Sequence, residues 1–266
     1  MTTDPTLIVA TPAPGVLHLI FNRPDVHNAY DTPTFTAFAE HLDRAATDPD
    51  IRAIVISARG GRAFSAGFDI HEMAGFDIHE MAGFDAATMR RAFETRDPVF
   101  GRVAAHPLPI IAAIDGICFG AGALLALACD MRIATPGFRF KVTAVGYGCA
   151  NATWSLPRAV GAPRAKAILM TGQVVEAEEA ERIGLVNEIV NASVLAARAI
   201  ALASAIAAHP PQGIGGIKSL VDGSLTRAPI EGWQAEYDWL IASMTGAPAG
   251  GETFGKFLSE HDDHKR

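Results

Sequence analysis

Two glycine-rich turns limit what this chain can fold into. Residues 64–70 (FSAGFDI) follow the apolar run 51–57, and residues 115–123 (DGICFGAGA) follow the apolar run 108–114. Each turn precedes a stretch with helical composition. Small residues let a backbone approach a ligand, and free N–H groups at a helix start attract negative charge. Alone, each turn is more often a packing feature, but two side by side can hold one oxyanion.

The remaining sequence alternates between strand and helix patterns. Strands are predicted over residues 16–21, 51–57, 108–114, 131–134 and 185–190. Helices are predicted over residues 34–46, 122–128, 162–171 and 176–183. From residue 195 onward the pattern is mainly helical, with breaks at Pro210-Pro211 and near residues 246–248. This order predicts an α/β fold with parallel strands and an α-helical C-terminal part.

Composition excludes several classes of protein. The chain has 266 residues and a net charge of −7, which argues against the basic surface of a nucleic-acid-binding protein. Its three cysteines are odd in number and form no C-x-x-C, so we expect a cytoplasmic protein without a disulfide framework or zinc site. The N-terminus lacks the pattern of a secretory signal, and the apolar stretch 110–128 contains Asp115 and several glycines. We therefore expect no membrane span.

An octapeptide duplication follows the first turn. The sequence AGFDIHEM occupies residues 66–73 and again 74–81, and a partial copy, AGFD, occupies 82–85. This period is too short for a solenoid repeat, so we interpret it as a duplication in a tolerant loop, with an extended lid as the alternative. In a helix, eight residues advance the chain by about 80° beyond two full turns, so consecutive copies face different sides. At most one copy then retains the original role, and we assign it to the first.

Together and in order, the motifs resemble those of the crotonase family, the enoyl-CoA hydratases and isomerases, over nearly the whole chain. The N-terminal signature is matched by Asn22-Arg23-Pro24 and Asn28-Ala29, and the first oxyanion loop by FSAGFDI. The second loop, with the following helix and strand, is matched by PIIAAIDG at 109–116 and GAGALLALACDMRIA at 120–134. The continuation is matched by TWSLPRAVG at 153–161, MTG at 170–172 and GLVN at 184–187.

The resemblance implies a fold and a ligand. The fold is a crotonase-type spiral of β-β-α repeats over residues 1–200, with a helical region for oligomerisation over residues 201–266, assembled as a homotrimer or hexamer. The ligand is the coenzyme A thioester of an acyl substrate. No metal or redox cofactor is implied, and no nucleic-acid or membrane partner.

Residue roles follow by position from the same resemblance. Phe68 and Ala121 are the oxyanion donors through their N–H groups. Residues near the adenine are Ala66, Asp69 and Ile70, and Phe254 and Lys256 resemble C-terminal CoA contacts, more loosely. From their own chemistry, Tyr147 can hydrogen-bond a substrate and Trp154 can wall an aromatic acyl pocket, although loop and core roles are equally open to them.

The sequence departs from the family at the hydratase glutamates. Leu124 stands where the first belongs, and Val142 lies near the second, with a one-residue ambiguity whose other member is Lys141. Leucine and valine cannot carry a proton. Because each acid–base group contributes about 10²–10⁴-fold, efficient hydration is not expected.

Cys149 is the candidate replacement. It lies five positions before Trp154, where the isomerase and dehalogenase branches of the family place an aspartate. A thiolate can act as nucleophile or proton carrier, whereas hydratases have glycine there and a small residue can simply fill the loop. The neighbours of the first loop, His71 and Glu72, are a weaker alternative.

Three functional interpretations follow. The first is a lyase or isomerase of the family that acts on an acyl-CoA through an oxyanion-stabilised enolate or tetrahedral intermediate. The second is a dehalogenase- or hydrolase-like enzyme that uses Cys149. The third is a catalytically silent CoA-binding or assembly protein, and turnover of any acyl-CoA would separate it from the other two.

Overall fold

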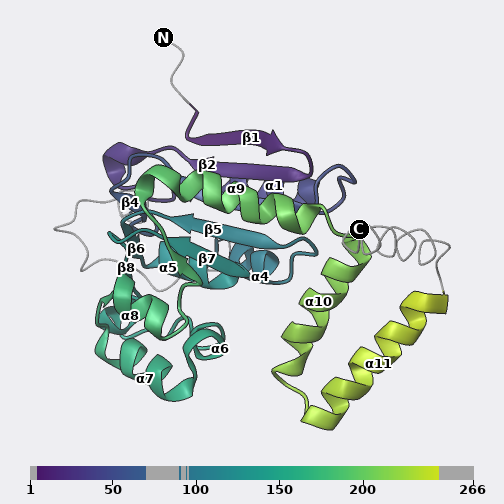
Figure 1. Ribbon diagram of the computed structural model, residues 1–266. Coiled ribbons are helices and arrows are strands. Elements are labelled where there is room, and N and C mark those ends of the chain that lie inside the picture. Colours follow the sequence, from purple (N-terminus) through teal and green to yellow (C-terminus); the bar gives the residue numbers. More distant parts are fainter. Residues whose placement is uncertain (1–4, 70–89, 91–93, 95, 246–266) are drawn as a thin grey trace, which may run out of the picture. The chain divides into compact units, whose positions relative to one another are not determined.

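The computed structural model describes residues 5–69, 90, 94 and 96–245 (Figure 1). The chain divides into two compact units, residues 1–214 and 215–266. The first unit contains all the strands of the described residues and both glycine-rich turns, and the second is helical where it is described.

A six-stranded sheet forms the centre of the first unit. Its strands stand in the order β1 (Leu7–Ala13), β2 (Val16–Phe21), β3 (Ala53–Ala58), β5 (Ile110–Ile114), β7 (Met131–Ala134) and β10 (Glu188–Ile189). β1 is antiparallel to β2, and every other pair is parallel. β-Branched and aliphatic residues dominate β3 and β5, which are buried on both faces, as expected for central parallel strands.

A second, four-stranded sheet has the order β4 (Ala63–Ser65), β6 (Ile117–Phe119), β8 (Arg139–Lys141) and β9 (Val175–Glu176). From β3 to β8, consecutive strands alternate between the two sheets, since β3 leads to β4, β5 to β6 and β7 to β8. The chain returns to the large sheet after β4 and after β6, with α5 (Ala121–Ala128) making the return from β6 to β7, whereas β8 is followed by β9 of the small sheet before β10 rejoins the large one. This alternation confirms the predicted spiral of β-β-α turns.

Helices cover both faces of the large sheet. On one face lies α9 (Leu195–Ala207) (Figure 1). Its small residues belong to one core with Val16, Val55 and Ile111. On the other face, α1 (Thr32–Ala45), α4 (Pro98–Ala104) and α5 contribute to a larger core with Ile54, Ile56 and Ala112. Successive side chains of a strand point to opposite faces of the sheet, so neighbouring residues such as Ile54 and Val55 belong to two separate cores. The remaining elements of this unit are η1 (Pro24–Val26), η3 (Ala144–Tyr147), α6 (Leu156–Val160), α7 (Ala162–Thr171), α8 (Ala177–Arg182) and η4 (Ala192–Val194).

The C-terminal helices are α10 (Pro211–Ser224), which begins in the first unit, and α11 (Pro229–Thr245). Any side chain at Gly216 would collide with the ring of Trp239, so glycine permits this close approach of the two helices. Apolar side chains on both helices are nevertheless exposed, among them Ile217, Ile230 and Met244.

The predicted elements differ from the structure in specific places. The strand predicted over 185–190 is reduced to Glu188–Ile189, because residues 184–186 bond back to the α8 turn through Leu185 N and Ala180 O. The sequence patterns do not predict β1, which contains Pro12, or the strands β4, β6, β8 and β9, which have only two or three residues each, too few for a periodic pattern. The break between α10 and α11, at residues 225–228, was also not predicted. The break near residues 246–248 lies outside the described residues.

The described helices fall short of a membrane span when each is taken singly. None of them is both long and apolar enough to cross a membrane, although the helical stretches 192–207 and 211–224 together satisfy the length and composition. Within the same described residues, no group of three His, Cys, Asp or Glu side chains is placed to hold a metal ion.

A buried histidine makes stability depend on pH. His18 on β2 lies against Ser57 on β3, with 2.8 Å between His18 Nε2 and Ser57 Oγ. Burial lowers the pKa of His18 from 6.5 to about 4. The unfolded chain therefore binds this proton first, and stability is lost as the pH falls from about 6.5 towards about 4. We expect the wild-type chain to lose about 2 kcal/mol more than His18→Gln between pH 7 and pH 4.5 in urea unfolding. Equal losses in both proteins would contradict this assignment.

Candidate active site

Three loops meet at one edge of the small sheet. β4 and β6 are parallel, with Ser65 opposite Cys118, and β6 and β8 are also parallel. The first loop (residues 66–69), the second loop (residues 120–124, which is Gly120 with the first turn of α5) and the third loop (residues 142–149, which includes η3) follow these strands in turn. Because the strands are parallel, all three loops begin at the same edge, which is where parallel sheets commonly bind ligands.

The first loop is held against Tyr30. The N–H of Tyr30 donates to Gly67 O at 2.8 Å, and the N–H of Asp69 donates to Tyr30 O at 2.9 Å. Gly67 C=O and Phe68 N–H belong to one planar trans peptide, so they point in opposite directions. Since the carbonyl points to Tyr30, the N–H of Phe68 points away from it. This N–H makes no hydrogen bond with another described residue.

The second loop brings a helix start beside the first. Ala121 is the first residue of α5, so its N–H has no partner within the helix. Gly120, which precedes it, has a φ of 51°, in the region that glycine favours. A Cβ atom added to Gly67 would lie 3.2 Å from Ala121 N. The backbones of the two loops therefore lie side by side at Gly67 and Ala121.

The end of β8 and the start of the third loop lie against Gly120 of the second loop. The N–H of Gly120 donates to Lys141 O at 3.0 Å, and a Cβ added to Gly120 would lie 3.4 Å from Thr143 Oγ1. Further along, Cys149 is exposed and its N–H donates to Ala144 O at 3.0 Å. Tyr147 is 70% exposed, and Trp154 is 49% exposed, so neither is a core residue.

The two positions that the family resemblance assigns to the hydratase glutamates, 124 and 142, hold apolar and packed side chains. Leu124, on the first turn of α5, is half-buried and contacts the main core. Val142 is buried at the start of the third loop. Neither side chain can donate or accept a proton. The described part of this edge therefore offers backbone N–H groups and no carboxylate at these two positions.

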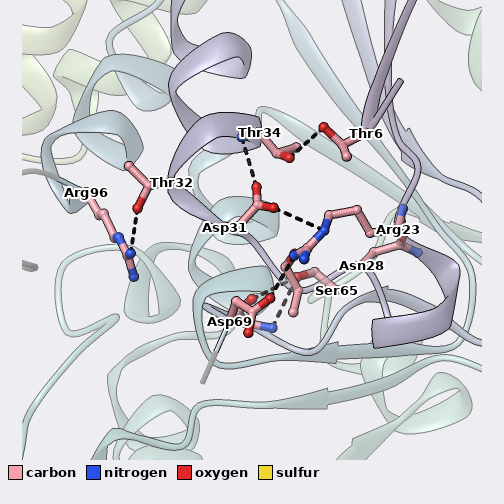
Figure 2. A network of polar contacts seen from close by, with 11 residues as sticks. Thr6, Arg23, Asn28, Asp31, Thr32, Thr34, Ser65, Asp69 and Arg96 are labelled. Carbon is pink, nitrogen blue, oxygen red and sulfur yellow. Dashed lines mark hydrogen bonds and ion pairs between the residues drawn. The ribbon is translucent and has the colours of Figure 1, made fainter. Parts of the chain in front are cut away.

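Sequence reasoning gave no role to a polar network behind the first loop, shown in Figure 2. Arg23 Nη1 donates to Asp69 Oδ2 at 2.9 Å, and Arg23 Nε lies 3.2 Å from Asp31 Oδ2. Asn28 Nδ2 donates to Arg59 O at 2.8 Å and to Ala63 O at 2.7 Å. The Asn22-Arg23-Pro24 signature was the available signal, but its charge partners lie up to 46 residues away.

Some of the remaining candidate residues lie on the first loop, and the others lie outside the described residues. Ala66 is exposed on the first loop, and Asp69 is buried in its ion pair with Arg23. Phe68 is half-buried, with its ring centroid 5.5 Å from that of Phe35. Outside the described residues lie Ile70, His71, Glu72, Phe254, Lys256 and the second and third octapeptide copies.

Comparison with solved structures defines the class of protein. The chain is similar to an enoyl-CoA hydratase from Bacillus anthracis, with a TM-score of 0.86 and 27% identity over 96% of this chain and 97% of that one. Sequence comparison finds similarity to (E)-benzylidenesuccinyl-CoA hydratase of Thauera aromatica, 36% identical over 199 residues, 74% of each protein. It also finds similarity to 1,2-epoxyphenylacetyl-CoA isomerase of Escherichia coli K12, 32% identical over 215 residues, 80% of each.

The family itself is established by a match over most of the chain. Residues 12–251 match the family described as Enoyl-CoA hydratase/isomerase. The chain therefore belongs to the enoyl-CoA hydratase/isomerase family and is an acyl-CoA enzyme of the crotonase fold.

Proposed function

We propose that this enzyme binds the carbonyl oxygen of an acyl-CoA thioester between the N–H groups of Phe68 and Ala121. The observation that carries the proposal is the approach of the two loops. A Cβ atom added to Gly67 would lie 3.2 Å from Ala121 N. Neither the N–H of Phe68 nor the N–H of Ala121 donates to another described residue. Paired N–H groups stabilise a thioester oxygen most strongly when it gains negative charge, in an enolate or a tetrahedral intermediate.

The proposed reaction class is isomerisation, lyase chemistry or hydrolysis, without efficient hydration. An oxyanion site lowers the barrier for all of these, but hydration also needs groups that activate water and deliver a proton. Leu124 and Val142 supply neither. In this proposal Ala66, Asp69 and Ile70 lie near the adenine of CoA, and Tyr147 and Trp154 lie near the acyl group, where their exposure leaves them available.

Calorimetric titration with crotonyl-CoA tests ligand binding directly. Because the site uses backbone groups that are already in place, we expect binding in the micromolar to millimolar range, as for ordinary enzyme substrates. Free coenzyme A should compete. A folded protein that gives no heat and no competition at saturating ligand would overturn the proposal, while the family assignment would stand.

Cys149 supports a second candidate function, covalent or proton-transfer chemistry at the third loop. The favouring observation is its exposure, since Cys118 and Cys129 are both buried. Its Sγ lies 3.7 Å from Tyr147 O, so the thiol sits beside the exposed tyrosine. This candidate corresponds to a dehalogenase- or hydrolase-like member of the family.

We expect Cys149→Ala to lose at least about 10²-fold in turnover on the best substrate of a panel of acyl-CoAs that includes dienoyl and halo-aryl thioesters. Intact-mass measurement on the same samples would show any acyl adduct. A matched control is Cys129→Ala, which removes a buried thiol of the same chain. If Cys149→Ala retains full turnover, the residue only fills the loop.

We also propose a homotrimer or hexamer assembled through the C-terminal unit. The support is a set of large apolar side chains on α10, α11 and the break between them that are 43–69% exposed in the single chain. Exposed apolar side chains, where they gather into a patch, commonly mark a protein–protein interface. The set is Ile217, Val221, Leu225, Ile230, Trp233, Tyr237, Leu240, Ile241 and Met244.

A further inference from the structure

We infer that Arg23 is a positioning residue for the oxyanion site, acting through Asp69 to fix the direction of the Phe68 N–H. The inference rests on the proposed function. It assigns a role to a side chain that does not itself touch the thioester, and it concerns the network drawn in Figure 2.

The guanidinium of Arg23 contacts three acceptors, two in residues 29–31 and one at Asp69. Its Nη1 donates to Asp69 Oδ2 at 2.9 Å and to Ala29 O at 2.6 Å, and its Nε faces Asp31 Oδ2 at 3.2 Å. The side chains of this arginine and of its carboxylate partners are no more than 20% exposed. Ion pairs shielded from water are screened less than surface pairs. The contact is therefore less screened than the exposed ion pairs of the described residues.

The second partner makes the anchor rigid. Asp31 is the N-cap of α1, and its Oδ1 accepts the N–H of Thr34 at 2.9 Å. Its other carboxylate oxygen faces Arg23, so the guanidinium is fixed to the start of a 14-residue helix. A planar guanidinium has donors for several acceptors at once, which a lysine ammonium cannot match with fixed geometry.

The anchored residue is the immediate neighbour of the proposed donor. Asp69 follows Phe68, and its own N–H donates to Tyr30 O, while Gly67 O on the other side accepts the N–H of Tyr30. The Phe68 peptide is thus held on both sides, by Tyr30 through the backbone and by Arg23 through the Asp69 side chain. Rotation of this peptide would turn the N–H away from the neighbourhood of Ala121. Arg23 opposes that rotation without contacting the ligand.

The test measures polarisation of the bound thioester in the intact protein. The infrared stretch of the crotonyl-CoA carbonyl falls when its oxygen accepts hydrogen bonds, so the wild-type protein should lower it relative to free ligand. We expect Arg23→Met to lose at least half of that shift while binding changes far less. Where a panel substrate is turned over, kcat should fall about 10²-fold, the scale of a small misplacement of a reacting group.

Further variants separate positioning from folding. Arg23→Lys should restore part of the carbonyl shift, because it returns the charge without the fixed geometry. Asp69→Asn should reduce the shift in a protein with unchanged α1, and combining it with Arg23→Met should add little, since both act on one contact. Arg102→Met is the matched control. It removes an ion pair of similar length, 2.8 Å to Asp43, whose side chains are 45% and 59% exposed, and should leave the shift unchanged.

Three outcomes are decisive. A wild-type protein that binds crotonyl-CoA without any carbonyl shift would overturn the proposed oxyanion site and this inference together. A wild-type shift that persists undiminished in folded Arg23→Met and Asp69→Asn would overturn the role of Arg23 alone. Loss of the shift with retained binding in Arg23→Met, and not in Arg102→Met, is the result expected of a positioning residue.

Discussion

Hydration of crotonyl-CoA by this enzyme should be at least about 10⁴-fold slower than hydration by a family member that has both glutamates. Water is a poor nucleophile at neutral pH, and its addition needs one group to take a proton and another to deliver one. Here Leu124 is half-buried against the core and Val142 is buried, so neither position can move a proton. The oxyanion site alone leaves the larger part of the barrier in place.

The measurement follows the ultraviolet absorbance of the enoyl thioester at neutral pH. A preparation purified from a host without its own crotonase, run beside Gly67→Ala, excludes contaminating activity. Turnover near about 10³ s⁻¹, the upper end of ordinary enzymes, would show that another group performs the acid–base work. The search would then move to Tyr147 and Cys149 on the third loop.

Gly67→Ala should lower turnover on the best acyl-CoA of the panel by about 10²–10³-fold, the cost of losing one oxyanion donor. Gly67 has a φ of 113°, which side chains with a Cβ rarely adopt. Its added methyl would lie 3.2 Å from Ala121 N and 3.4 Å from Phe119 O, inside the space between the two loops. The loops must separate or the thioester oxygen must move, and both weaken the paired hydrogen bonds.

Gly161→Ala is the matched control for Gly67→Ala. Gly161 also has a positive φ, 79°, but an added Cβ there would meet no atom within 4 Å. It should lose some stability through backbone strain, of order 1–3 kcal/mol, and keep turnover per folded molecule. Equal losses of turnover in both variants would attribute the effect of Gly67→Ala to strain and not to the oxyanion site.

Much of the fold could be predicted because the parallel strands of the large sheet and several helices carry strong local patterns, although β1 does not. The runs at 16–21 and 131–134 became β2 and β7 with the predicted bounds, and the helix predicted over 162–171 became α7. The order of the motifs along the chain was enough to identify the family, and the match over residues 12–251 confirms it. The assignments of Phe68, Ala121 and Cys149 to catalytic roles stay predictions.

Short strands and pairings at a distance could not be predicted in the same way. A strand of three residues, such as β6 inside the second glycine-rich turn, leaves no periodicity to detect. Its existence depends on hydrogen bonds to β4 and β8, which come from other parts of the chain. The C-terminal break at 225–228 is followed by a single proline, Pro229, and is a weaker local signal than the adjacent pair Pro210-Pro211 at the start of α10.

The sequence by itself determined the family, the two glycine-rich loops and the absence of carboxylates at positions 124 and 142, because residue identity and spacing carry this information directly. Only the tertiary structure decided that the loops approach at Gly67 and Ala121, and that Arg23 joins Asp31 and Asp69 behind them. Those contacts bring together residues that are up to 54 positions apart in the sequence, the most distant of them at the ends of paired parallel strands. Their geometry follows from strand pairing and helix placement, which no local pattern encodes.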